Sequence, residues 1–236
     1  MKYKYSNILV LLTVIVLVLS FVSAVPTDNK AKEPLDKITF IHHKDGTVKA
    51  IGGNSKLPTC YKLMGVKWSS LPVSYVINPT NDDSLTPEFI TSAISTSAET
   101  WDVATSKELF NNAYAIDFSA QYGVQNYMNA IVFGNYPQSG VIGVTSVWYT
   151  RYGKQIVEFD MILDTDFAWG DATNNPSLMD LQNIVTHELG HSIGLSDLYT
   201  NSCTAVTMYG YSTNGETSKR TLEQSDINGL QKMYGI

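Results

Sequence analysis

The stretch Thr186–Asp197, with the sequence T-H-E-L-G-H-S-I-G-L-S-D, constrains this chain more than any other part of it. His187 and His191 are four residues apart, so on a helix both imidazoles project from one face, one turn apart. This spacing suits two nitrogen ligands of a tetrahedral Zn²⁺, and Glu188 can reach a water at such a metal without itself being a ligand. Gly194 suits the end of the helix, because glycine readily adopts the left-handed conformation there.

Asp197, at the end of this pattern, is the expected third metal ligand. The chain has four histidines, and none of them follows His191. We therefore predict one catalytic zinc ion held by His187, His191 and Asp197, with Glu188 as the general base. The competing interpretation of a bare H-E-x-x-H is a surface helix with two hydrogen-bonded histidines. The apolar residues that recur at three- and four-residue steps through the motif favour the zinc site, because they predict an amphipathic helix.

These residues resemble the long zinc motif of the metzincins, a clan of zinc endopeptidases. That motif usually ends in histidine, and a terminal aspartate, as here, resembles its snapalysin-like form. A carboxylate neutralises part of the metal charge, so the zinc is expected to be a slightly weaker Lewis acid than with three imidazoles. The resemblance extends over roughly Trp68–Gly235, in which Trp68, a helix ending at Trp101 and the final stretch Leu222–Gly235 are similar to the matrixin branch.

The resemblance implies an α+β fold, in which a twisted mixed sheet lies above the active-site helix and a C-terminal helix follows. It also implies a Met-turn, a tight turn with a methionine beneath the zinc, for which Met208 is the candidate. The segment Gly143–Tyr149 is expected to form the antiparallel edge strand beside the cleft, where an extended substrate can add as a further strand. Residue patterns predict a helix starting at Thr86-Pro87 and strands at Val73–Ile77, Tyr114–Phe118, Ala130–Phe133, Val141–Tyr149 and Ile156–Leu163.

The first part of the chain is expected to be processed. Residues 1–24 have two early lysines, an apolar run and Val22-Ser23-Ala24, as in a secretory signal peptide. The alternative is an uncleaved membrane anchor, and in both cases the remainder lies outside the cell. Residues 25–58 are a predicted leader, which is a propeptide, an N-terminal extension or a small docking hairpin, and residues 59–236 are the predicted catalytic domain.

Within the leader, Ile38–Ile41 and Thr47–Ile51 are expected to pair as a hairpin, followed by the linker Gly52–Ser55. The adjacent His42 and His43 are candidate metal ligands, but a solvated turn is the favoured interpretation, because neighbouring residues of a strand point to opposite faces.

The two cysteines of the chain, Cys60 and Cys203, are predicted to form a disulfide, as is simplest in an exported protein. The alternative is a latch, in which the Cys60 thiolate caps the zinc until the leader is cut and Cys203 stays free. The Asp- and Asn-rich stretch Asp164–Asn175 is a candidate calcium site, although a solvated loop is favoured.

Taken together, these features predict a secreted zinc-dependent endopeptidase that acts as a monomer on protein or peptide substrates. Its net charge of −6, without a basic run, argues against nucleic acid or an anionic membrane as partner. One alternative is a non-catalytic extracellular binding or surface protein that retains a metzincin fold, although such a protein has no need of Glu188. Another is a zinc hydrolase with a substrate other than protein.

Overall fold

A computed structural model of the protein describes residues 33–44 and 59–236. All of these residues belong to one compact unit, Glu33–Ile236. The predicted signal peptide (1–24), the predicted strand Thr47–Ile51 and the predicted linker Gly52–Ser55 lie outside the described residues. Within the described part of the chain, no helix is long and apolar enough to cross a membrane.

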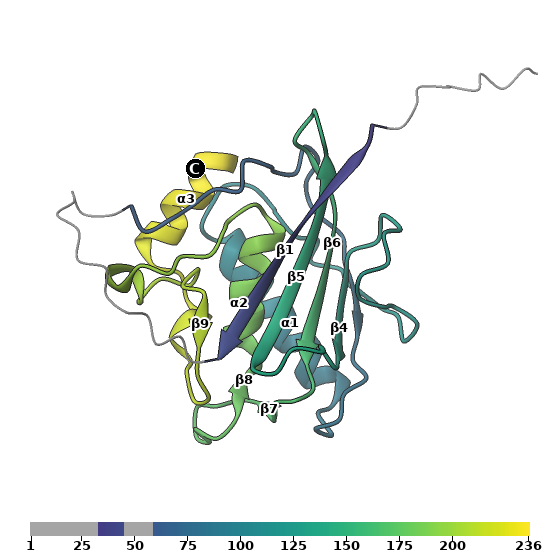
Figure 1. Cartoon of the computed structure of the whole chain (residues 1–236), viewed down its shortest axis with the longest axis vertical. Helices are drawn as coiled ribbons and strands as arrows, with labels where there is room; N and C mark the ends of the chain where they lie inside the picture. The colour runs from purple at the N-terminus through teal and green to yellow at the C-terminus, as the bar shows by residue number, and fades with distance from the viewer. Residues whose placement is uncertain (1–32, 45–58) are drawn as a thin grey trace, which may run out of the picture. The chain divides into compact units, whose positions relative to one another are not determined.

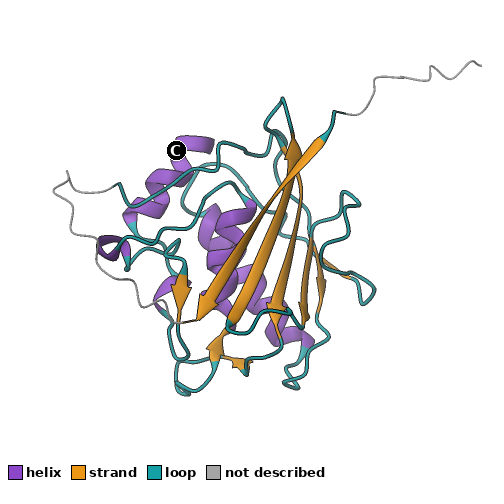
Figure 2. Ribbon diagram, in the orientation of Figure 1, coloured by secondary structure: helices purple, strands orange, loops and turns teal. Residues whose placement is uncertain are grey.

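The architecture is a seven-stranded mixed sheet with the helices α1 and α2 against one face (Figures 1 and 2). The strand order is β3-β2-β4-β6-β5-β1-β9, and β7 and β8 form a separate pair. Most neighbouring strands are parallel, while β5 runs antiparallel to both β6 and β1. This arrangement confirms the predicted α+β fold class. The strands are β1 (Leu35–Lys44), β2 (Val76–Asn78), β3 (Ala115–Ile116), β4 (Ala130–Gly134), β5 (Val141–Thr150), β6 (Ile156–Asp164), β7 (Trp169–Gly170), β8 (Met179–Asp180) and β9 (Tyr211–Ser212).

The helices are α1 (Pro87–Asp102), α2 (Leu181–Ser192) and α3 (Gln224–Tyr234), with short 3₁₀ turns η1 (Asn201–Cys203) and η2 (Ser218–Arg220). Helix α1 begins as predicted, because the Thr86 side chain accepts a hydrogen bond from the Phe89 N–H and a proline occupies the first helical position. Its buried face packs on α2, where Trp101 Nε1 donates to the Thr186 carbonyl at 2.8 Å. Helix α1 thereby supports α2, the helix that carries His187 and His191.

The predicted edge position of β5 is wrong in this structure. Strand β5 has β6 on one side and β1 on the other, and the pairing with β1 runs from Leu35 opposite Thr150 to His43 opposite Val141. The segment Ile38–Ile41 is therefore part of a longer strand that joins the main sheet. The expected solvated turn at His42 and His43 is also wrong, because both residues lie within β1. Every strand offers the same main-chain donors and acceptors, so the sequence alone did not reveal which strand β1 would join.

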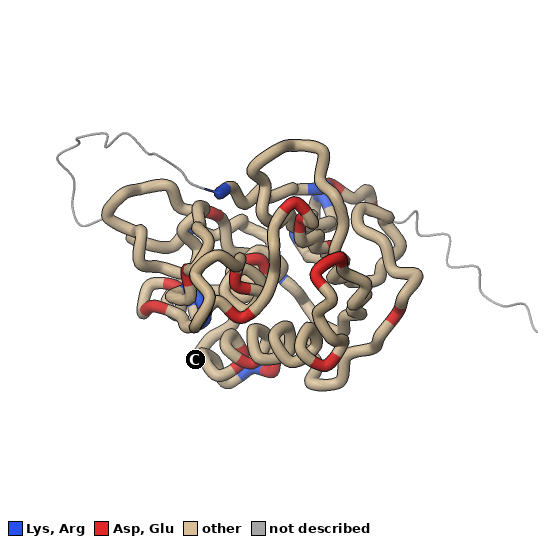
Figure 3. The backbone as a smooth tube through the Cα atoms, turned by 90° about the horizontal axis from the view of Figure 1, so that it is seen from below, with Lys and Arg blue, Asp and Glu red and all other residues tan. Residues whose placement is uncertain are grey.

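The charged residues are spread over the fold. The chain has 16 basic and 22 acidic residues, and in the view of Figure 3 the Lys and Arg positions are few and well separated. The prediction that neither nucleic acid nor an anionic membrane is a partner stays a prediction.

Candidate active site

Helix α2 places the motif residues in the interior. Asp180 is the N-cap of the helix, and its side chain accepts the Asn183 N–H at 2.9 Å. The side chains of His187, Glu188 and His191 are fully buried. At the end of the helix, Gly194 has a φ of +110°, and a Cβ there would lie 2.5 Å from the Val66 carbonyl oxygen. Glycine is therefore required for the turn that returns the chain toward Asp197.

The two histidines are held with one nitrogen free for a metal. His187 Nδ1 lies 2.7 Å from the Thr207 carbonyl oxygen, and His191 Nδ1 lies 2.9 Å from the Leu195 carbonyl oxygen. A carbonyl only accepts hydrogen bonds, so both Nδ1 atoms carry the proton and both Nε2 atoms present a lone pair. This is the orientation in which histidine binds metal, fixed here by the backbone.

Asp197, the expected third ligand, lies beside both histidines. Its Oδ1 lies 3.2 Å from His187 Nε2 and 3.3 Å from His191 Nε2, close to the roughly 3.3 Å edge of a tetrahedron with zinc–ligand distances near 2.0 Å. All three atoms are buried, and none makes a hydrogen bond within the described part of the chain. Burial opposes ionisation of Asp197, but the histidines outweigh it and hold the pKa of this carboxyl well below its usual range. This donor set fits zinc.

The sequence analysis missed Tyr199, which contacts the candidate third ligand, Asp197. The Tyr199 hydroxyl donates to Asp197 Oδ2 at 3.1 Å, on the carboxylate oxygen that does not face the histidines. Such a bond orients a carboxylate ligand. No sequence signal marks this role, because a tyrosine two residues beyond the motif can equally point into solvent.

Glu188 lies beside this set. Its Oε2 accepts a hydrogen bond from Thr145 Oγ1 at 2.6 Å, and a Cβ at Gly143 would lie 3.2 Å from its Oε1. Strand β5 therefore positions the Glu188 carboxylate in two ways: Thr145 donates a hydrogen bond to it, and Gly143 leaves room for it. Burial raises the pKa of Glu188, but a hydrogen bond from His42 and the nearby histidines outweigh burial, so its pKa is lowered and the group is a carboxylate at neutral pH.

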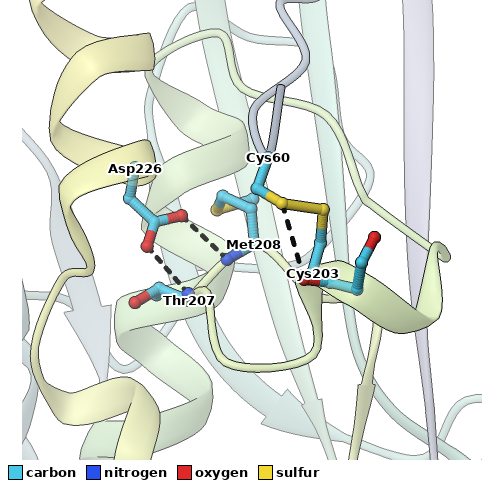
Figure 4. The surroundings of a disulfide bond; sticks show 6 residues. Cys60, Cys203, Thr207, Met208 and Asp226 are labelled. Atoms are coloured by element: carbon cyan, nitrogen blue, oxygen red, sulfur yellow. Dashed lines mark hydrogen bonds between the residues drawn. A yellow bond between two sulfur atoms is a disulfide. The ribbon is translucent and has the colours of Figure 1, made fainter. Parts of the chain in front are cut away.

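Met208 lies beneath helix α2. A Cβ at Gly190 would lie 2.2 Å from Met208 Sδ, so the sulfur packs against the helix backbone between the two histidines. The buried Asp226 of α3 accepts the Thr207 N–H at 2.9 Å and the Met208 N–H at 3.2 Å (Figure 4). Asp226 thus holds the turn at Thr207 and Met208, and the Thr207 carbonyl group of this turn orients His187. Spacing along the chain does not reveal this link.

The two cysteines form the predicted disulfide, Cys60–Cys203 (Figure 4). It joins the start of the predicted catalytic domain to η1, which precedes the Met208 turn. Neither cysteine is free, so the alternative of a Cys60 latch on the metal is wrong in this structure.

Strand β1 brings two further aromatic rings to the site. His42 is 1 % exposed, its Nδ1 lies 3.2 Å from Glu188 Oε1, and its ring centroid lies 4.0 Å from that of His187. Burial, more than the neighbouring His187, lowers the pKa of His42 to about 4. The ring is therefore neutral at neutral pH and donates its Nδ1–H to the Glu188 carboxylate. Phe40, two residues earlier, stacks on His191 with 4.0 Å between centroids.

Comparison with known proteins shows the family to which this chain belongs. The Matrixin family profile matches residues 67–235. Stromelysin-2 of Rattus norvegicus is 28% identical over 208 residues, which are 84% of this chain and 38% of that protein. Metalloendoproteinase 1 of Glycine max is 40% identical over 78 residues, which are 31% of this chain and 24% of that protein. The chain thus spans less than half the length of these relatives. Because the family profile covers most of the chain, this protein belongs to the matrixin family.

Proposed function

We propose that this protein is a secreted zinc-dependent endopeptidase whose zinc is held by His187, His191 and Asp197. The observation that carries the proposal is a set of three buried donor atoms that make no hydrogen bond to residues 33–44 or 59–236, grouped beside a carboxylate that is not part of the set. Membership of the matrixin family and relatives named as metalloproteinases support it. The disulfide supports an extracellular location, because such bonds persist in oxidising compartments.

Each residue has a role in this proposal. The two histidines and Asp197 bind the metal, and bound zinc supplies Lewis acidity for a carbonyl group and for water. Glu188 takes a proton from water on its Oε1 and later returns it to the leaving amine, while Thr145 holds its Oε2. No side-chain nucleophile is required.

The test uses protein purified without chelator, its zinc content, and the cleavage of an unfolded protein near neutral pH. We expect about one zinc per chain. Glu188→Gln should keep the zinc and lose cleavage, because Glu188 acts on water, whereas Asp197→Ala should lose zinc. A zinc-free parent would refute the proposal, and so would cleavage by Glu188→Gln at the parent rate.

A further inference from the structure

Strand β1 lies where an extended substrate is expected to add. Residues Leu35–His43 pair antiparallel with β5 and so use the main-chain groups through which β5 would take up another extended chain. We infer that β1 is an internal inhibitor of the active site, and that His42 is the residue that blocks the general base. The inference rests on the endopeptidase function proposed above.

The contact between His42 and Glu188 covers the carboxylate that the proposed reaction needs. Glu188 Oε2 is taken by Thr145 at 2.6 Å, and Glu188 Oε1 is taken by His42 Nδ1 at 3.2 Å. With His42 in place, both carboxylate oxygens have a partner, and a water can reach Glu188 Oε1 only if the His42 ring moves away. The side chains of His42 and Glu188 are both 0% exposed, so solvent does not compete for either group.

The same face of β1 also covers the metal-binding histidines. Phe40 and His42 are two residues apart, so their side chains point to one face of the strand. Phe40 stacks on His191 with the ring planes 7° apart, and the His42 ring lies over His187. Two aromatic rings from one strand therefore occupy the space above both histidine ligands, where a scissile peptide would have to lie.

The strand is anchored beyond the site, as an inhibitor must be. At its start, the Glu33 carboxylate accepts the Tyr152 N–H at 2.5 Å and the Gly153 N–H at 2.7 Å. Next to it, Arg151 pairs with Asp36 at 2.7 Å. At the other end β1 pairs with β9. The exposed ion pair contributes little by itself, and the main-chain pairing on both edges of the strand is the larger part of the attachment.

Strand β1 is an effective inhibitor because it belongs to the same chain as the active site. A segment tethered to the groove acts at a high effective concentration, so a substrate in solution must compete with it at every encounter. Cleavage then proceeds only in the fraction of molecules from which β1 has moved away, and variants that weaken β1 raise that fraction.

The test compares the full-length parent with the double variant Phe40→Ala/His42→Ala. Two measurements are made on zinc-loaded protein: cleavage of an unfolded protein, and amide hydrogen exchange of β5. We expect at least about tenfold faster cleavage by the double variant, because the open fraction rises. We also expect faster exchange at β5 and unchanged zinc content. Lys37→Ala is the matched control, since Lys37 is an exposed residue on the other face of the same strand. Its ammonium lies 5.2 Å from the centre of the Trp148 ring of β5 and away from the histidines, so this control removes a β1–β5 contact outside the site and should change cleavage far less than the double variant does.

A synthetic peptide of residues 35–44 provides a second measurement. Added to the double variant, it should slow cleavage and restore the protection of β5, and a peptide with His42→Ala should do so less. Should the double variant fail to fold, His42→Ala alone leaves Phe40 and the main-chain pairing in place, and faster cleavage is again expected. A parent rate in folded His42→Ala would overturn the role of His42.

The outcomes separate the two proposals. Equal cleavage and equal β5 exchange in the parent and the double variant would overturn the inhibitor and leave the endopeptidase standing. Faster β5 exchange in a zinc-loaded double variant that cleaves nothing would overturn the endopeptidase, and the inhibitory role with it.

Discussion

Reduction of the Cys60–Cys203 disulfide should destabilise the protein strongly. The two cysteines are 143 residues apart in the sequence. In the chain-entropy treatment, a crosslink that closes a loop of this length lowers the free energy of folding by about 5 kcal/mol, because it restricts the unfolded chain. Small domains are stable by roughly 5–15 kcal/mol, so this single bond accounts for a large share of the total.

Urea unfolding of the oxidised and the reduced protein measures this contribution. Both samples have the same sequence, so the comparison removes no side-chain atoms. Zinc is removed from both with a chelator, because a ligand bound only to the folded state would add its own stabilisation. The double variant Cys60→Ala/Cys203→Ala serves as the control and should match the reduced parent in its urea midpoint.

The result also bears on the site, since the bond fixes the segment that leads into the Met208 turn. The reduced protein should lose stability by several kcal/mol, on the order of the entropic figure. A loss below about 1 kcal/mol would refute the reasoning, because it would mean that the unfolded chain gains little freedom when the bond is cut.

Three further substitutions test other parts of the structure. Gly190→Ala should lower the free energy of unfolding by about 1–3 kcal/mol, because the alanine Cβ would lie 2.2 Å from Met208 Sδ. This cost outweighs the better helix propensity of alanine. An unchanged midpoint of thermal unfolding would contradict the close packing of Met208 on the helix. Burial raises the pKa of Asp102 from 3.8 to about 6, so between these pH values the folded chain holds more protons than the unfolded one and stability falls as pH rises, by on the order of 1–3 kcal/mol. Urea unfolding of zinc-free protein at several pH values measures this fall in the free energy of unfolding, which should be smaller in Asp102→Asn. An identical dependence of the free energy of unfolding on pH in both proteins would argue against a raised pKa of Asp102. Tyr199→Phe should weaken zinc binding by about 10–100-fold, because it removes the hydroxyl that orients Asp197; competition with a chelator measures this, and an unchanged affinity would remove Tyr199 from the site.

The sequence determined those features that depend on neighbours along the chain. The four-residue step from His187 to His191 places both rings on one helical face wherever the helix lies in the fold. Gly194 allows the turn after the helix in any context, and Thr86 caps its helix through an N–H three residues away. For the same reason the strands of the sheet were predicted near their observed positions, because alternation and β-branched residues act locally.

Only the tertiary structure decided which distant segments meet. His42 reaches Glu188 across 146 residues of sequence, and Asp226 reaches the Thr207 N–H from a separate helix. Nothing local marks either contact, since a strand offers the same main-chain groups to any partner and a buried carboxylate can accept from any N–H brought to it. The pairing of β1 with β5 follows from packing in three dimensions. The sequence predicts a strand only at Ile38–Ile41, and the space beside β5, above the two histidines, determines where the longer strand β1 lies.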